Sequence, residues 1–239
     1  QLCAMAAAKD SNDTSPRSKA AVLSQTALME MIEHKKMTAE EVNKQRSCLQ
    51  SLTGLVKGLG PDWHVRPFGS SANGFGMTGS DLDVTCFRAG ASDQERSRCI
   101  RELQSRLLPI IEQDQRFEVI KAIWTARVPI VKLKFEDLDV DLSCQNTEAL
   151  VNTELLKIYS QMNELIRALV VAVKLWAKSQ QVCGSPQGHL SSYSLTLMVI
   201  YFLQVQPDLK FPVLPTEPFS SGQSAMFEHF QWECSQHLS

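Results

Sequence analysis

The spacing of apolar residues changes along the chain and predicts several kinds of element. Residues 20–59 have helical spacing, and Thr38 is the expected N-cap because Glu40 and Glu41 follow in the first turn, where the helix dipole stabilises carboxylates. Short runs that alternate between apolar and polar residues come next and predict strands. The expected strands are 64–68, 82–87, 119–124, 128–135 and 140–144, the last two joined by a hairpin turn around residues 136–138.

Helical spacing returns in two places. One amphipathic helix is expected over residues 94–113, since its apolar positions fall on one face. After residue 146 the spacing indicates three helices, near 148–161, 163–181 and 190–206.

This order of elements predicts the domain organisation and the fold class. We expect an α/β (α+β) domain with a mixed sheet over residues 18–146, followed by an all-helical central domain over residues 147–239. Residues 1–17 are small and polar, and such segments bury too little apolar surface to fold, so we expect them to be disordered.

Composition limits the possible functions without selecting one. The chain has 239 residues, 44% of them hydrophobic and 21% charged, which is the balance of an ordinary globular protein. Its net charge of −2 gives no support to nucleic-acid binding, so that function has to be argued from a site. The seven cysteines form no CxxC pair, which favours reduced thiols and a cytoplasmic location, with nucleus and mitochondrion as alternatives. No apolar stretch reaches the about 20 residues that span a bilayer, so we expect no membrane association.

Three acidic residues on expected strands are the strongest sign of chemistry. Asp81 and Asp83 are two apart, so on a strand their carboxylates lie on one face, where they raise each other's pKa unless a cation lies between them. Asp141 lies on another expected strand. Carboxylate oxygens are the ligands that Mg²⁺ prefers, and three of them suit a two-metal site for Mg²⁺ or Mn²⁺. Asp139 shares a face with Asp141 but lies nearer the turn, and is the alternative third ligand.

The glycine-rich segment before these acids has several possible interpretations. Residues 74–79 match GxGxxG, but a dinucleotide site requires a helix directly afterwards and a kinase loop requires a strand lysine, so both are rejected. Gly69 and Ser70 instead follow an expected strand and are expected to open a short helix, where backbone N–H groups and a serine hydroxyl bind phosphate. Glycine at position 69 would let the backbone approach a triphosphate closely.

Two segments resemble a known family. They are Phe68–Gly76 followed by Ser80–Asp83, and the helical block Leu190–Gln204. Both are similar to signatures of the polymerase-beta-like nucleotidyltransferases, and most similar to the Cid1-type terminal uridylyltransferases and noncanonical poly(A) polymerases. The resemblance covers roughly residues 40 to 215.

The resemblance implies a role for each matching residue. The matches are Asp81, Asp83 and Asp141 for catalysis and metal binding, Gly69, Ser70, Lys174, Lys178 and Ser192 for the phosphates, Asn152 for the sugar and Tyr193 for stacking on the base. The two lysines are four residues apart, so on a helix both ammonium groups lie on one face.

The implied activity is template-independent addition of nucleotides to the 3′ end of single-stranded RNA, with a nucleoside triphosphate as the second substrate. Similarity of Asn73–Gly76 to the uridylyl branch favours UTP, and an ATP-using noncanonical poly(A) polymerase is the alternative. The family's chains continue beyond the position of residue 239 with a base-selecting loop, so we expect the helical domain to be incomplete. The alternative of another class is an inactive nucleotidyltransferase-fold module that binds RNA or protein, and the sequence identifies no protein partner.

Overall fold

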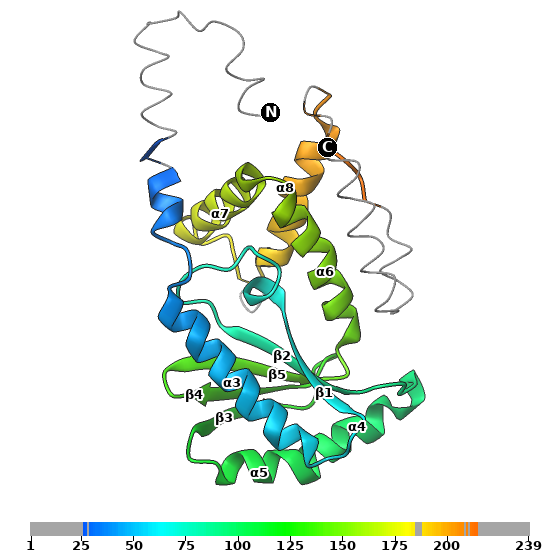
Figure 1. Ribbon diagram of the computed structural model, residues 1–239. Coiled ribbons are helices and arrows are strands. Elements are labelled where there is room, and N and C mark those ends of the chain that lie inside the picture. The colour runs from blue at the N-terminus through cyan, green and yellow to red at the C-terminus, as the bar shows by residue number, and fades with distance from the viewer. Residues whose placement is uncertain (1–25, 28, 185–187, 208, 210, 215–239) are drawn as a thin grey trace, which may run out of the picture. The chain divides into compact units, whose positions relative to one another are not determined.

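The computed structural model of the chain describes residues 26–214, with gaps at 28, 185–187, 208 and 210 (Figure 1). The segment 1–17, expected to be disordered, lies outside the described residues.

The described residues belong to two compact units. The sheet unit comprises Met37–Met162, and the C-terminal unit comprises Asn163–Pro215 together with the residues up to Lys36. The expected domain boundary at residue 146 lies sixteen positions earlier and on the other side of a helix, α6 (Thr147–Met162), which belongs to the sheet unit. The functional domain ranges 18–146 and 147–239 stay a prediction.

The sheet unit is built on one mixed sheet, as the sequence predicts. Its strands are β1 (Trp63–Phe68), β2 (Leu82–Arg88), β3 (Phe117–Ile123), β4 (Ile130–Phe135) and β5 (Leu138–Cys144). The order across the sheet is β1-β2-β5-β4-β3. The central pair β2 and β5 is parallel, and the other three pairs are antiparallel. The expected hairpin is confirmed by the antiparallel pairing of β4 with β5, and Glu136 in its turn has a left-handed φ of 57°.

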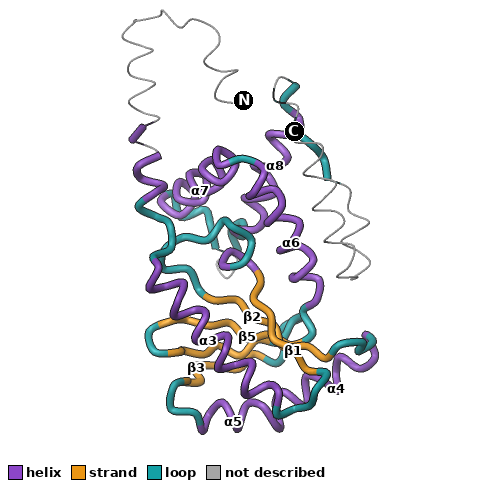
Figure 2. The backbone as a smooth tube through the Cα atoms, viewed as in Figure 1, coloured by secondary structure: helices purple, strands orange, loops and turns teal. Residues whose placement is uncertain are grey.

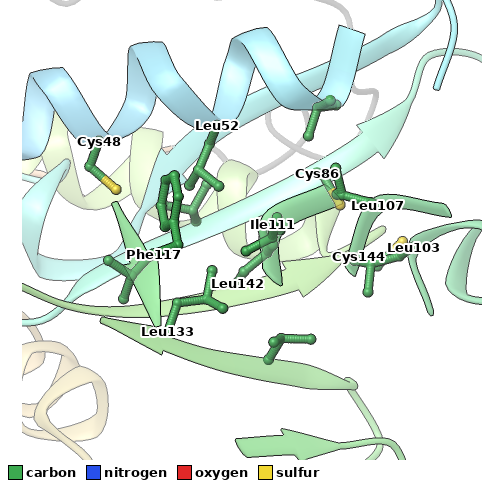
Figure 3. Close-up of a cluster of buried hydrophobic side chains, with 14 of the residues drawn as sticks. Cys48, Leu52, Cys86, Leu103, Leu107, Ile111, Phe117, Leu133, Leu142 and Cys144 are labelled. Carbon is green, nitrogen blue, oxygen red and sulfur yellow. The ribbon is translucent and has the colours of Figure 1, made fainter. Parts of the chain in front are cut away.

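Helix α3 (Ala39–Lys57) lies along one face of this sheet (Figures 1 and 3). Its N-cap is Thr38, as predicted: the hydroxyl of Thr38 accepts a hydrogen bond from the backbone of Glu41, and the side chain of Glu41 accepts one from the backbone of Thr38. This reciprocal arrangement is a capping box, which satisfies two backbone donors at once. The buried side chains Cys48 and Leu52 of α3 belong to the hydrophobic core.

The hydrophobic core fills one side of the sheet only. Along β4 the side chains alternate, so that Val131, Leu133 and Phe135 are buried in the core, whereas Lys132 and Lys134 lie on the other face, as the two-residue period of a strand requires. Figure 3 shows Leu52, Leu133 and further side chains of the core meeting between the helices and the sheet. The opposite face of the sheet is therefore available for polar side chains.

The helix expected over residues 94–113 is present but is not one regular helix. It consists of α4 (Arg96–Glu102), a π-helical turn (Leu103–Leu107) and α5 (Leu108–Gln113). The backbone N–H of Leu108 donates to the carbonyl of Leu103, five residues back. Pro109, at the start of α5, has no N–H and its ring crowds the carbonyl four residues earlier, which accounts for a wider turn at this point.

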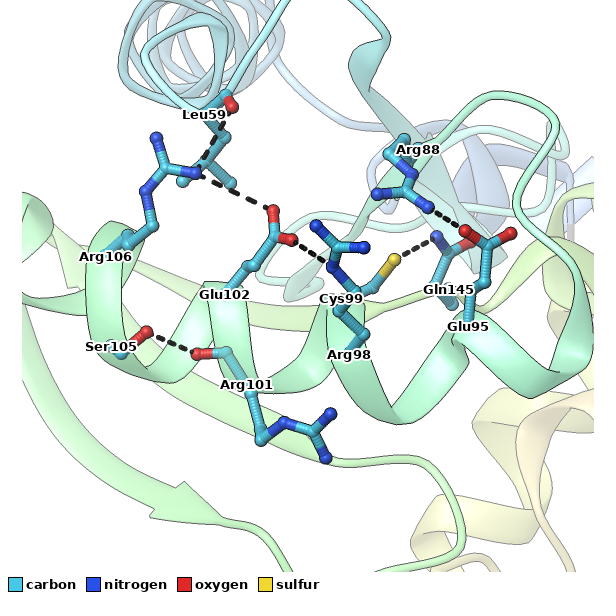
Figure 4. A network of polar contacts seen from close by, with 10 residues as sticks. All are labelled: Leu59, Arg88, Glu95, Arg98, Cys99, Arg101, Glu102, Ser105, Arg106 and Gln145. Carbon is cyan, nitrogen blue, oxygen red and sulfur yellow. Dashed lines mark hydrogen bonds and ion pairs between the residues drawn. The ribbon is translucent and has the colours of Figure 1, made fainter.

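Arg106, which lies in the π-helical turn, reaches the C-terminal end of α3 and also forms an ion pair with Glu102. Glu102 lies between Arg98, at 3.2 Å, and Arg106, at 3.7 Å. The Arg106 guanidinium also donates to the backbone carbonyls of Gly58, at 3.4 Å, and Leu59, at 3.5 Å. Figure 4 shows the contacts of Arg106 with Leu59 and Glu102. The guanidinium thus lies at the C-terminal end of α3, an end that attracts positive charge.

Two helices lie in the described part of Asn163–Pro215. They are α7 (Glu164–Ser179) and α8 (Ser192–Val205), which pack against each other. Both begin at a polar N-cap, Asn163 for α7 and Ser191 for α8, each with a side-chain hydrogen bond to the first turn. Within the part of the chain that the structure describes, no helix has the length and apolar character needed to cross a membrane.

Candidate active site

The three predicted carboxylates lie at one place in the sheet unit. Asp81 directly precedes β2, and Asp83 is the second residue of that strand. Asp83 pairs in register with Asp141 on the parallel neighbour β5. Their neighbours Leu82, Val84, Val140 and Leu142 are buried in the core, so the carboxylates point to the opposite face. Asp83 and Asp141 thus share one face of adjacent strands, as the sequence pattern predicted, and Asp81 lies just before the first of these strands.

The electrostatics of Asp83 agree with the expected repulsion. The pKa of Asp83 is raised to about 7, first because the carboxyl is buried, and then because Asp141 and Asp81 are nearby negative charges. Lys132 acts in the opposite direction. A carboxylate held among like charges is a favourable environment for a cation, which would stabilise its ionised form.

Lys132 on β4 is the counter-charge of this site, and it is a residue that the sequence reasoning missed. Its ammonium nitrogen lies 3.0 Å from both carboxylate oxygens of Asp141, and the hydrogen bond to Asp141 raises the pKa of Lys132. The hairpin register places Lys132 opposite Asp141 and Lys134 opposite Asp139. Counting outward from the predicted turn would have found both pairs.

The strand register also distinguishes Asp141 from Asp139, the alternative third ligand. Asp139 is exposed, lies 3.9 Å from Lys134, and has no register partner on β2. Asp141, in contrast, faces Asp83 directly. Of these two acids, Asp141 is the one that shares a site with Asp83.

The Gly69–Ser71 turn lies against Asp83. It is a short 3₁₀ helix, as expected, and it begins where β1 ends. Gly69 has a left-handed φ of +70°, and a Cβ atom at this position would lie 2.5 Å from Oδ2 of Asp83. Only a residue without a side chain allows this approach. The glycine therefore brings the turn, and with it Ser70, next to the carboxylate.

Thr153 of α6 fixes this turn. Its buried hydroxyl accepts a hydrogen bond of 2.9 Å from the backbone N–H of Gly69 and donates one of 2.7 Å to the carbonyl of Ala149. Asn152, the predicted sugar contact, is the exposed neighbour of Thr153 on the same helix. Sequence reasoning missed Thr153 because this contact joins segments far apart in the chain.

The GxGxxG segment has a packing function. Figure 2 shows the connection from residue 72 to residue 81 as loop, followed by the strand β2 and not by a helix, which agrees with rejecting a dinucleotide fingerprint. Gly74 has a φ of +83°, and a Cβ there would lie 2.3 Å from the hydroxyl of Ser160. A Cβ at Gly76 would lie 2.8 Å from the carbonyl of Ser70. These glycines let the loop pack closely on α6 and on the Gly69–Ser71 turn.

The remaining predicted residues lie in the C-terminal unit. Lys174 is 3% exposed and its pKa is lowered to about 8, first by burial and then by Lys178. Lys178 is exposed one turn further along α7. Ser192 is the first residue of α8, and the next residue, Tyr193, is 42% exposed with a pKa raised by burial. The phosphate and base contacts of these residues stay predictions.

The carboxylates fit a divalent cation by their chemistry. Asp81, Asp83 and Asp141 supply hard oxygen donors, and the turn at Gly69 lies directly against Asp83. Among the described residues, no group of three His, Cys, Asp or Glu side chains is arranged so that it could hold a metal ion by itself. An incomplete protein shell is what Mg²⁺ ordinarily has where substrate phosphates and waters supply the other ligands.

Comparison with known proteins adds independent information. The family described as "Poly(A) RNA polymerase, mitochondrial-like, central palm domain" matches residues 24–161. The chain is 38% identical over 167 residues to terminal uridylyltransferase 7 from Homo sapiens, which covers 69% of this chain and 11% of that protein. It is 32% identical over 202 residues to poly(A) RNA polymerase GLD2 from Rattus norvegicus, which covers 79% of this chain and 40% of that protein.

A solved structure with the same fold carries a nucleotide. The Cid1 poly(U) polymerase with Mg 3′-dATP bound has a TM-score of 0.65 and 30% sequence identity, over 78% of this chain and 57% of that chain. The chain thus spans less than half the length of both curated relatives.

Proposed function

Because the chain belongs to the family of mitochondrial-like poly(A) RNA polymerase central palm domains, among the polymerase-beta-like nucleotidyltransferases, we propose that it transfers nucleotides from a nucleoside triphosphate to the 3′ end of RNA. The observation that carries this proposal is the in-register pair of Asp83 and Asp141, with Asp81 two residues away and the Gly69 turn alongside.

The residues divide into those that hold metal and those that hold the nucleotide. Asp81, Asp83 and Asp141 would bind the divalent cations, which supply charge neutralisation at the phosphates and a more acidic attacking hydroxyl. Gly69 and Ser70 place a turn for the triphosphate next to these acids. On the C-terminal unit, Lys174, Lys178 and Ser192 would hold the phosphates and Tyr193 the base, and Asn152 of the sheet unit would contact the sugar.

The reaction is an in-line displacement at the α-phosphorus. The 3′-hydroxyl oxygen of the RNA forms the new bond, the bond to the bridging oxygen breaks, and pyrophosphate leaves. The proton of the hydroxyl moves toward a carboxylate oxygen of Asp141. Lys132, 3.0 Å from both of those oxygens, holds that carboxylate in place, and a fixed group of this kind contributes to catalysis through its position.

UTP is the proposed nucleotide and ATP the alternative. The similarity to a terminal uridylyltransferase at 38% identity supports UTP, whereas the similarity to a poly(A) RNA polymerase at 32% identity supports ATP. RNA with a free single-stranded 3′ end is the proposed acceptor.

Primer extension tests the proposal. The 239-residue chain is incubated with labelled single-stranded RNA, Mg²⁺ or Mn²⁺, and each nucleoside triphosphate in turn. We expect extension with UTP, lost by on the order of 10³-fold in Asp83→Asn and Asp141→Asn, since each removes a metal ligand. The matched control is Asp139→Asn, which neutralises a second acid on the same face of β5 and is expected to retain activity.

Each other outcome has a definite meaning. Extension with ATP alone moves the activity to the poly(A) branch. RNA binding without extension by any nucleotide contradicts transfer by this chain and supports the inactive binding module. If Asp139→Asn loses activity and Asp141→Asn keeps it, Asp139 is the third metal ligand in place of Asp141.

A further inference from the structure

The loop that leads to Asp81 has no regular structure of its own. From residue 72 to residue 81 it contains neither helix nor strand. Phe75 and Met77 anchor its first half because both are buried, at 0% and 4% exposure. The second half, Thr78 to Ser80, comes directly before Asp81. Within the loop, this half is held by a turn in which Ser80 donates its backbone N–H to the carbonyl of Met77, at 3.1 Å, and accepts a hydrogen bond of 3.2 Å from the Met77 N–H at its hydroxyl. A contact from a neighbouring element can fix this turn relative to the rest of the sheet unit.

Glu41 of α3 makes that contact. Its Oε1 accepts hydrogen bonds from the hydroxyl of Thr78, at 2.7 Å, and from the backbone N–H of Gly79, at 2.8 Å. Its Oε2 accepts a hydrogen bond of 2.7 Å from the backbone N–H of Thr38. One carboxylate therefore joins the start of a helix to the turn that ends two residues before Asp81.

The helix is a firm anchor for this contact. Cys48, Leu52 and Val56 of α3 are at most 1% exposed and pack in the core of the sheet unit. Glu41 also lines, with Ser80 and Asp81, a cavity of about 190 Å³. The carboxylate thus lies beside the segment that it holds.

We propose that Glu41 is a positioning residue for Asp81: by binding Thr78 and Gly79, it sets the position in which the loop presents this carboxylate to the metal. The inference rests on the proposed function, because it concerns the same metal site. The hydrogen bonds described for the Glu41 carboxylate come from Thr38, Thr78 and Gly79. Glu41 therefore acts on Asp81 through the loop.

The state of Glu41 suits this role. Its pKa is lowered to about 2, chiefly by the hydrogen bond from the Thr38 backbone, with further lowering by Gly79 and Thr78. Glu41 is therefore ionised throughout the neutral range and accepts all three hydrogen bonds. A glutamine would present an amide NH₂ group to donors, so it cannot satisfy all three.

The competing explanation is that Glu41 only caps α3. Two matched variants separate the two roles. Thr38→Ala removes the other half of the capping box, the hydrogen bond from the Glu41 backbone to the Thr38 hydroxyl, and leaves the contacts of Glu41 with the loop. Thr78→Val removes one loop contact and leaves the helix cap.

The experiment measures Mn²⁺ binding by the 239-residue chain through the EPR signal of free Mn²⁺, with and without UTP, together with the melting temperature and with kcat and KM for extension. We expect Glu41→Gln and Thr78→Val to weaken Mn²⁺ binding and lower kcat by about 10-fold, the range found when groups that orient metal ligands are removed. Thr38→Ala is expected to lower the melting temperature by as much as Glu41→Gln while its Mn²⁺ affinity stays within about 2-fold of the parent.

The outcomes distinguish this inference from the proposed function. If Glu41→Gln matches Thr38→Ala in Mn²⁺ affinity and kcat, Glu41 is only a cap and the inference is overturned, while the proposed function stands. If the parent chain binds Mn²⁺ but extends no RNA, the proposed function fails and the Mn²⁺ affinities still decide the role of Glu41. A parent chain that binds no Mn²⁺ overturns both.

Discussion

At the scale of single residues, the geometry of the site depends on Gly69 having no side chain. The turn at Gly69 approaches Asp83 so closely that a Cβ atom would lie 2.5 Å from the carboxylate. An added methyl group cannot be accommodated unless the carboxylate of Asp83 rotates away. The glycine therefore influences the position of the Asp83 carboxylate, a proposed metal ligand, as well as the shape of the backbone.

Gly69→Ala is expected to reduce RNA extension by on the order of 10²-fold, because displacing a reacting group by about 1 Å has effects of this size. The matched control is Gly90→Ala. Gly90 has nearly the same φ, +71° against +70°, but nothing lies within 4 Å of its added Cβ. Both variants carry the left-handed strain of about 1 kcal/mol, measured as free energy of unfolding in urea.

Equal activity in the two glycine variants would contradict this account, since it would mean that left-handed strain, and not the contact with Asp83, is the whole effect.

The residues of the site differ in how far the sequence could predict them. Asp81, Asp83 and Asp141 were proposed because the two-residue period of a strand places such residues on one face, and the register shows this arrangement for Asp83 and Asp141. Lys132 follows from the same hairpin, by counting from the turn. Thr153 and Glu41 could not be predicted, because their contacts join segments whose separation no local pattern encodes.

At the scale of elements, Glu41 in the first turn of α3 both caps this helix and holds the loop that precedes Asp81. Because the pKa of Glu41 is lowered from 4.5 to about 2, its contribution to stability is present above pH 4.5 and is lost as the pH falls toward 2. Protonation turns one of the two carboxylate oxygens into a donor, so that Glu41 can no longer accept the hydrogen bonds from Thr38, Thr78 and Gly79 all at once.

As the pH is lowered from 4.5 to 2, we therefore expect the free energy of unfolding to decrease less steeply for Glu41→Gln than for the parent. The two slopes should differ by up to about 1 kcal/mol per pH unit, the effect of one carboxyl group. Urea unfolding at several pH values measures this slope. Glu40→Gln, a neutralisation at the adjacent position of the same turn, is the control and should keep the slope of the parent. Identical slopes in all three proteins would show that Glu41 has no lowered pKa.

The sequence predicted correctly those elements that a single local pattern determines. The five strands and the hairpin follow from alternation and turn residues, and the α3 N-cap follows from Thr38 and the acids after it. The helix at 94–113 was predicted as one regular element because its apolar period continues through Leu103–Leu107. The π-helical turn depends on Pro109 and on tertiary packing, which an average period does not reveal.

At the scale of the whole molecule, the proposed metal ligands and the predicted phosphate-binding lysines belong to different compact units. The core cluster draws its buried residues from between Cys48 and Cys144, all inside Met37–Met162. Lys174, Lys178, Ser192 and Tyr193 belong to Asn163–Pro215. The sequence places its expected boundary before α6, whereas the compact units divide after it; the spacing of α6 is that of an ordinary amphipathic helix and does not indicate to which unit the helix belongs.

A protein of residues 37–162 alone is expected to fold, because its hydrophobic core is complete, and to lack nucleotide transfer, because the predicted phosphate and base contacts are absent. Cooperative thermal unfolding and dispersed amide resonances in NMR spectra would verify the fold, and primer extension would verify the missing activity. A non-cooperative transition would contradict the first expectation. Extension by residues 37–162 would contradict the second and remove the roles assigned to α7 and α8.

The strand order β1-β2-β5-β4-β3 also has a consequence for how the chain assembles. Strand β5 pairs locally with β4 but meets β2 only when segments distant in sequence come together, and such non-local pairings form late because closing a long loop is entropically unfavourable. Asp141 therefore reaches Asp83 already paired with Lys132, which lies on the same hairpin. Lys132 therefore offsets part of the negative charge of Asp141 when β5 meets β2, which reduces the repulsion between Asp141 and Asp83 during this step.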